Sequence, residues 1–232
     1  DQDQLFWADG LDELLTAPRL LLDPNGLSAD GTVAMTAARV SPDGLLLAYA
    51  VSEAGSDWRT IRVREVATGR DRPDELRHAK WIDPTWLPDA SGFLYWRYPD
   101  AAGGELTEAM GPGELVLHRL VADPGAVSDP GAAELVWTPP DRDWMADPWV
   151  APDGRWLVLT ASPGTDSRTL VTAHRLRRTG GRLVVDPVAV RVVTELADAH
   201  HVVGSDGDTL YLRTERDAPR GRLVAVDLSG DP

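Results

Sequence analysis

The sequence predicts an all-β protein, and among all-β folds it favours a β-propeller built from four-stranded antiparallel blades. Short apolar segments follow one another along the 232 residues, and several have the two-residue period of a strand. Residues 58–66, for example, place Ile61 and Val63 on one face and Arg62 and Arg64 on the other. A turn of the Pro-Asp-Gly type also recurs before apolar segments at intervals close to the length of one blade.

The expected strands can be followed from the N-terminus. Segments 5–7 and 19–23 indicate part of a first blade. Segment 11–16, between them, is the main helix-like candidate and is too short to shape the architecture. The remaining strand-like segments are 45–52, 58–66, 93–98, 115–121, 134–138, 155–161, 168–176, 188–196, 209–215 and 222–228.

The recurrent turn precedes the second strand of each expected blade. Its Asp residues are Asp43, Asp89, Asp153 and Asp206, separated by 46, 64 and 53 residues. In such a turn Pro presets φ, Asp accepts local backbone hydrogen bonds and Gly takes the positive φ that follows. Four-stranded propeller blades recur at roughly 40–50 residues, so the longest spacing is expected to contain extra loop, at 100–113 and 123–132.

These spacings give one domain over 1–232, a partial β-propeller. Its blades are expected at about 1–34 (partial), 35–80, 81–140, 141–197 and 198–232 (partial). The alternative is a β-sandwich with irregular hairpins. Sandwiches rarely repeat one turn at blade spacing, which favours the propeller.

Composition limits the possible partners and compartments. The net charge of −14 repels nucleic acid and anionic lipid, and the longest apolar runs are only a few residues, so we expect neither a nucleic-acid partner nor a membrane segment. The chain has no cysteine, which removes disulfides and thiolate chemistry. A cytoplasmic location is expected, with the periplasm and secretion left open.

Motifs for catalysis, cofactors and metals are not found in the sequence. No serine lies in the Gly-x-Ser-x-Gly elbow of an α/β-hydrolase, and there is no HExxH motif, Walker loop or dinucleotide-binding glycine motif. His200 and His201 are adjacent, so in a strand they point to opposite faces and cannot easily share a metal. We therefore expect no catalytic residue, metal or cofactor in this chain.

A family resemblance is carried mainly by residues 21–99. The string SEAGSDW at 52–58 is followed by an Ile-Arg-Val strand, and LDPN at 22–25 is followed by DGT at 30–32. On these residues the chain resembles the propeller of the prolyl oligopeptidase family of serine peptidases. Weaker similarity continues through 143–145 and 213–228.

This resemblance implies about half of a seven-bladed propeller that is inserted into, and caps, an α/β-hydrolase domain. The catalytic Ser, Asp and His would lie in that domain, which follows the propeller and is absent from this chain. The intact enzyme would cleave short peptides after proline by acyl transfer, with the propeller as a lid and filter. The alternatives are a stand-alone propeller that binds proteins and the propeller of an oligopeptidase B-like enzyme, which would cleave after Arg or Lys.

The resemblance also implies site residues. Trp81 corresponds to an aromatic that contacts the bound peptide, although a tryptophan is by itself more often core, and Met145 corresponds to a methionine that does the same. Ser162 stands near the position of an arginine that holds the peptide, and a serine cannot make a bidentate contact. From their position before a strand, Asp57 and Trp58 are expected to be structural, with Asp57 accepting backbone hydrogen bonds.

An incomplete propeller would leave sheet edges and blade faces open. Exposed edges and apolar faces recruit other chains, so self-association, most simply as a pair, is expected. The alternative is a monomer whose blades close on themselves. The isolated chain is expected to have no peptidase activity.

Overall fold

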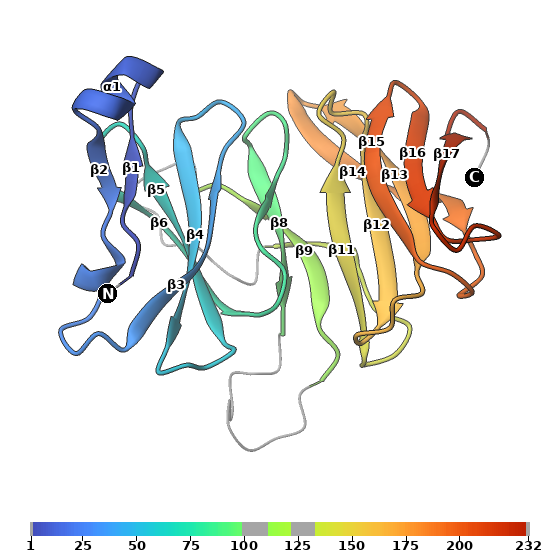
Figure 1. Ribbon diagram of the computed structural model, residues 1–232, viewed down its shortest axis with the longest axis horizontal. Helices are drawn as coiled ribbons and strands as arrows, with labels where there is room; N and C mark the ends of the chain where they lie inside the picture. The colour runs from blue at the N-terminus through green and yellow to red at the C-terminus, as the bar shows by residue number, and fades with distance from the viewer. Residues whose placement is uncertain (1, 99–110, 122–132, 231–232) are drawn as a thin grey trace.

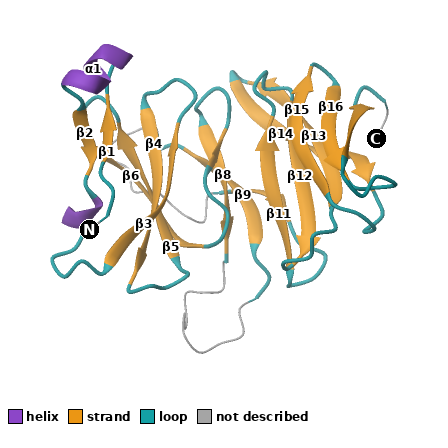
Figure 2. Cartoon of the chain, in the orientation of Figure 1, coloured by secondary structure: helices purple, strands orange, loops and turns teal. Residues whose placement is uncertain are grey.

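The computed structural model describes residues 2–98, 111–121 and 133–230. Nearly all of the regular structure there is strand (Figure 2). The short helix α1 (Leu11–Thr16) and the 3-10 turn η1 (Pro24–Gly26) both lie near the N-terminus. Neither is a candidate for crossing a membrane, because no helix in the described ranges has the necessary length and apolar character.

The strands form sheets that succeed one another from one end of the molecule to the other (Figure 1). A two-stranded sheet comes first, made of β1 (Leu5–Trp7) and β2 (Arg19–Leu22). An antiparallel meander of four strands follows, made of β3 (Val33–Val40), β4 (Leu46–Glu53), β5 (Arg59–Glu65) and β6 (Asp71–Ala79).

The second meander is joined to the first where Ala79 of β6 pairs with Arg97 of β8. Its strands are β7 (Thr85–Trp86), β8 (Gly92–Arg97), β9 (Glu114–Arg119) and β10 (Glu134–Trp137). The third contains β11 (Trp144–Val150), β12 (Trp156–Pro163), β13 (Leu170–Thr179) and β14 (Arg182–Val193). The last sheet has three strands, β15 (His200–Asp206), β16 (Thr209–Thr214) and β17 (Arg222–Asp227). The predicted all-β architecture of four-stranded antiparallel sheets is confirmed.

The core lies between successive sheets, because the middle strands are buried on both faces. In β8, Phe93 and Tyr95 pack toward the preceding meander, whereas Leu94 and Trp96 pack toward the following one. Alternate residues of β4 and of β12 divide between two clusters in the same way. Each of the three meanders therefore contributes one face to each of two hydrophobic layers, which is how blades stack in a propeller.

The recurrent turns have the predicted chemistry. Asp43 accepts a hydrogen bond from the Leu45 backbone N–H at 3.1 Å, and Asp153 accepts one from that of Arg155 at 3.0 Å. Gly44 and Gly154 have φ values of 75° and 72°, which strain a residue with a Cβ. These aspartates are therefore structural residues of the turns.

Several strands of the structure were not predicted from the sequence. The first strand of each meander and the whole of β6 were not expected, and β14 begins at Arg182 rather than at 188. For β6 and β11 the reason is composition, because β6 contains Pro73 and five charged side chains and β11 contains Pro148. The extra loops expected at 100–113 and 123–132 lie largely outside the described residues.

Candidate functional site

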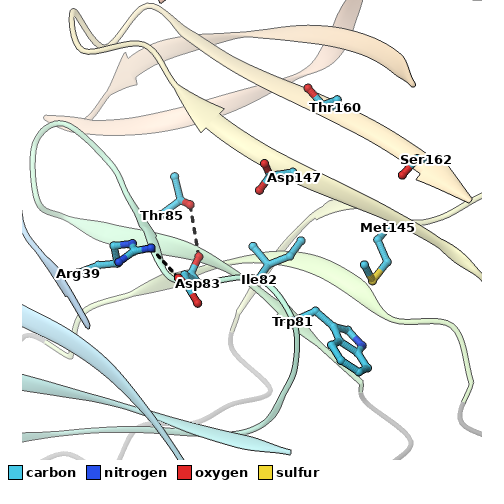
Figure 3. A pocket seen from close by; sticks show the side chains of 9 residues that line it. All are labelled: Arg39, Trp81, Ile82, Asp83, Thr85, Met145, Asp147, Thr160 and Ser162. Carbon is cyan, nitrogen blue, oxygen red and sulfur yellow. Dashed lines mark hydrogen bonds and ion pairs between the residues drawn. The ribbon is translucent and has the colours of Figure 1, made fainter. Parts of the chain in front are cut away.

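A cavity of about 460 Å³ lies where the first strands of three successive meanders approach one another (Figure 3). Arg39 comes from β3 and Thr85 from β7, and the β6–β7 connection adds Trp81, Ile82 and Asp83. Strands β11 and β12 complete the lining with Met145, Asp147, Thr160 and Ser162. Trp81 and Met145, which the family resemblance implies as site residues, thus line one cavity.

The register of β11 and β12 fixes one wall of the cavity. Met145 pairs with Ser162 and Asp147 pairs with Thr160, so these four side chains share a face of the sheet. Ala146, between Met145 and Asp147, is fully buried on the opposite face, in the hydrophobic layer between sheets. Burial of that face holds the wall rigidly against the rest of the blade.

Trp81 is presented by an unusual turn. The Ile82 N–H donates to the Lys80 carbonyl at 2.7 Å, which closes a three-residue γ-turn with Trp81 at its centre. Trp81 has a φ of 62°, rare for a bulky side chain, and is 45% exposed. Strained residues of this kind persist where the surrounding structure holds them, and they concentrate at functional sites.

A cluster of aromatic rings lies behind Trp81. Trp58 is half-buried and meets the rings of His78 and Tyr98 edge to face, at centroid distances of 5.9 and 5.7 Å. The Lys80 ammonium lies 4.1 Å from the centroid of the Trp58 ring and 5.4 Å from that of Trp81. Lys80 is only 6% exposed, so this cation–π contact is largely desolvated and correspondingly strong.

Asp57 lies apart from these contacts. Its side chain is exposed, and within the described ranges no hydrogen bond or ion pair involves its carboxylate. The hydroxyl of Ser56 instead accepts a hydrogen bond from the Trp58 backbone N–H at 3.1 Å. The structural role expected for Asp57 finds no support here, because the neighbouring serine satisfies the turn.

Two carboxylates in the cavity have different surroundings. Asp83 is ion-paired with Arg39 at 2.6 Å and with Arg59 at 3.1 Å, one guanidinium to each of its oxygens. Asp147 makes no ion pair or hydrogen bond with the described residues. Partial desolvation by the cavity walls, and then the negative charge of Asp83, raise the pKa of Asp147 above its usual value, although its side chain keeps contact with solvent.

Ser162 also lines the cavity, opposite Met145. Ser162 is half-buried and carries no charge. The resemblance places an arginine near this position, and no residue of β11 or β12 supplies a positive charge in its place. Trp81 and Met145 also border a second hollow of about 580 Å³, which Tyr98 and Pro163 help to line. No group of His, Cys, Asp and Glu among the described residues is suited to hold a metal ion.

The repeat contained a signal for this site that sequence reasoning missed. Trp81 lies eight residues before the turn residue Asp89, and Met145 lies eight residues before the turn residue Asp153. Asp83 and Asp147 each lie six residues before the same turns, and a proline follows each of them. Aligning the blades on their turns therefore selects both pairs without any knowledge of relatives.

Comparison with known proteins gives matches along the whole chain. The sequence model described as "Prolyl oligopeptidase, N-terminal beta-propeller domain" matches residues 1–232. The dual function macrocyclase-peptidase POPB of Galerina marginata is 30% identical over 224 residues, which cover 91% of this chain and 30% of that protein. The prolyl endopeptidase of Elizabethkingia meningoseptica is 29% identical over 210 residues, covering 90% of this chain and 28% of that protein.

Solved structures agree with the sequence matches. Prolyl oligopeptidase B from Galerina marginata, bound to a 25mer macrocyclization substrate, superposes with a TM-score of 0.86 at 26% identity. That match covers 99% of this chain and 33% of the solved chain. This chain thus spans about three tenths of the length of the relatives that it matches.

Proposed function

Since the chain belongs to the prolyl oligopeptidase family and matches its N-terminal β-propeller domain, we propose that it is the propeller part of a serine peptidase that cleaves short peptides after proline. The propeller acts as a lid and substrate filter, and the catalytic Ser, Asp and His belong to an α/β-hydrolase domain of the longer protein. The share of the relatives that this chain covers leaves ample length for such a domain.

The observation that carries the proposal is the meeting of Trp81 and Met145 at one cavity. Trp81 comes from the β6–β7 connection and Met145 from β11, at equivalent positions of the repeat, and Trp81 is an exposed aromatic held in a strained turn. An indole ring and a thioether provide a large apolar surface that suits the ring of a proline-containing peptide. We therefore assign both side chains to binding the peptide substrate.

The test is substrate kinetics of the full-length protein with Trp81→Ala. Loss of an aromatic contact worth about 1 kcal/mol is expected to raise KM for a short proline peptide by roughly two- to tenfold. The melting temperature is expected to change little, because Trp81 is half exposed. Phe6→Ala is the matched control, since Phe6 is an aromatic of 47% exposure outside the cavity.

Two results would contradict the assignment. Unchanged KM in Trp81→Ala would remove Trp81 from the binding site. A variant that fails to fold would identify Trp81 as a core residue, and Met145→Ala would then test the same cavity independently. Absence of proline-specific cleavage by the full-length wild type would reject the proposed activity itself.

Self-association of the 232-residue chain is a further part of the proposal. The sheets nearest the two termini are narrow, with two strands in β1–β2 and three in β15–β17. Val203 and Leu223 in the last sheet are 56% and 63% exposed. Narrow sheets with open edges and exposed apolar side chains favour pairing with another chain.

A further inference from the structure

Asp147 lines the proposed peptide-binding cavity, and its carboxylate forms no ion pair or hydrogen bond with the described residues. We propose that Asp147 is a specificity-determining residue that binds a cationic group of the peptide substrate, the guanidinium of arginine above all. This inference rests on the proposed function, because it assigns the class of peptide that the cavity prefers. Three independent features of the cavity lead to it.

The first feature is the equivalent residue in the preceding blade. Asp83 and Asp147 occupy the same position relative to their turns, 64 residues apart. Asp83 binds guanidinium groups on both of its oxygens, those of Arg39 and Arg59. A carboxylate at this position of the repeat is thus sterically and electrostatically suited to guanidinium, which matches a carboxylate fork to fork.

The second feature is that Asp147 has no such partner among the residues that the structure describes. Arg39 is the one basic residue that lines the cavity in the described part of the chain, and it is ion-paired with Asp83 at 2.6 Å. The side chains that share the wall with Asp147 are Met145, Thr160 and Ser162, none of them charged. Partial desolvation and the charge of Asp83 disfavour the ionised form, so an incoming cation would relieve both effects.

The third feature is the spacing along β11. Asp147 and Met145 are two residues apart on one face of a strand, a separation of roughly 7 Å. An extended peptide has the same period of two. A peptide whose apolar residue contacts Met145 therefore places the side chain two residues away beside Asp147, with the intervening side chain pointing elsewhere.

The experiment measures kcat/KM of the full-length protein for proline peptides of one length. A single arginine is moved along the positions before the proline, with glutamine at the same positions as the neutral reference. We expect the wild type to prefer arginine over glutamine by roughly two- to fivefold at one position, since the carboxylate keeps some contact with solvent. The preference is expected to weaken as salt is added.

Asp147→Asn keeps the shape of the side chain and is expected to abolish the preference, so that the arginine and glutamine peptides are cleaved with equal kcat/KM. Asp147→Lys is expected to reverse it in favour of glutamate at that position. Glu195→Gln is the control for net charge, because Glu195 is exposed and does not line the cavity. It is expected to leave the preference intact.

The outcomes separate the two proposals. If the wild type cleaves the neutral peptide without preferring arginine anywhere, the role of Asp147 is wrong and the proposed function stands. If Asp147→Asn slows both peptides equally, Asp147 is structural and the proposal is also wrong. If no proline peptide is cleaved, the proposed function fails, and the inference fails with it.

Discussion

Lys80 is the single lysine among 23 basic residues, and its ammonium lies close to the rings of two tryptophans, Trp58 and Trp81. Lys80 also supplies the carbonyl that closes the turn around Trp81. We therefore regard Lys80 as a positioning residue for Trp81.

Lys80→Met tests this role, because it keeps an unbranched stem but removes the charge. We expect KM for a proline peptide to rise in the full-length protein while kcat stays close to wild type, and we expect the tryptophan fluorescence to shift. Arg70→Met is the control, since Arg70 is an exposed turn residue without such contacts. Equal losses in kcat and stability, with KM unchanged, would show that Lys80 only supports the fold.

Asp74 is a fully buried carboxylate of β6 that ties this strand to β9 and to the residues that follow β9. It accepts hydrogen bonds from His118 Nε2 at 2.7 Å and from the Val121 N–H at 3.0 Å, and Arg72 lies 3.4 Å away. Burial acts to raise the pKa of Asp74, but these hydrogen bonds and charges outweigh it and lower the pKa below the ordinary 3.8. The ionised carboxylate is thus stabilised by folding.

The sign of the pH dependence follows from this direction. Because the folded pKa is lowered, the stabilisation by Asp74 is fully present above about pH 4 and is lost as pH falls through the folded pKa. Asp74→Asn is expected to lower the free energy of unfolding by about 1–3 kcal/mol at pH 7. The difference from wild type, measured by chemical denaturation, is expected to shrink in acid. A difference independent of pH would contradict this interpretation.

At the scale of elements, the pairing of β8 with β9 depends on Gly92. A Cβ at this position would lie 2.1 Å from the His118 carbonyl oxygen and 3.3 Å from the Arg119 Cα. Both are backbone atoms, so the strands themselves would have to separate. Gly92→Ala is expected to cost about 1–3 kcal/mol of stability, as overpacking typically does.

Gly204→Ala is the matched control for this substitution. Gly204 also lies in a strand, β15, with no atom within 4 Å of an added Cβ and without a positive φ. Its melting temperature is expected to stay close to wild type. Equal destabilisation by the two substitutions would mean that loss of glycine, rather than the contact with β9, is responsible.

The strands differ in how far sequence could predict them. Middle strands such as β4, β8 and β12 are apolar on both faces, so their residues alone identify them. Strand β6 is charged and contains Pro73, and β11 alternates an exposed Asp147 with a buried Pro148, patterns that also occur in loops. These residues form strands because β6 pairs with β5 and β11 pairs with β12. A local sequence pattern cannot predict such pairing.

The site was predictable in the same uneven way. Trp81 and Met145 follow from the family resemblance, and the structure brings them to one cavity. Asp83 and Asp147 were missed, because an aspartate before a proline is an ordinary turn residue. Asp83 is neutralised by Arg39 and Arg59, whereas Asp147 has no such partner in the described part of the chain. This contrast needs the tertiary structure, because the two arginines lie 44 and 24 positions before Asp83 in the sequence.

For the whole molecule, the narrow sheets near the two termini predict the hydrodynamic behaviour of the 232-residue chain. We expect it to sediment as a pair at micromolar concentration, with a mass close to twice 25.2 kDa, and to dissociate on dilution. The charge of −14 opposes random aggregation but not a specific contact. A concentration-independent monomer with cooperative unfolding would mean that the sheets close on themselves.

The cavity has walls on three successive meanders, and this arrangement affects how its specificity can change. Its width depends on the angles between blades, which are set by the hydrophobic layers that separate them. A substitution in such a layer, for example at Leu94 or Leu159, rotates one wall relative to another without altering any lining residue. Substitutions at buried positions can therefore change which ligand the cavity prefers. Directed-evolution libraries for this site should include these buried positions as well as the lining residues.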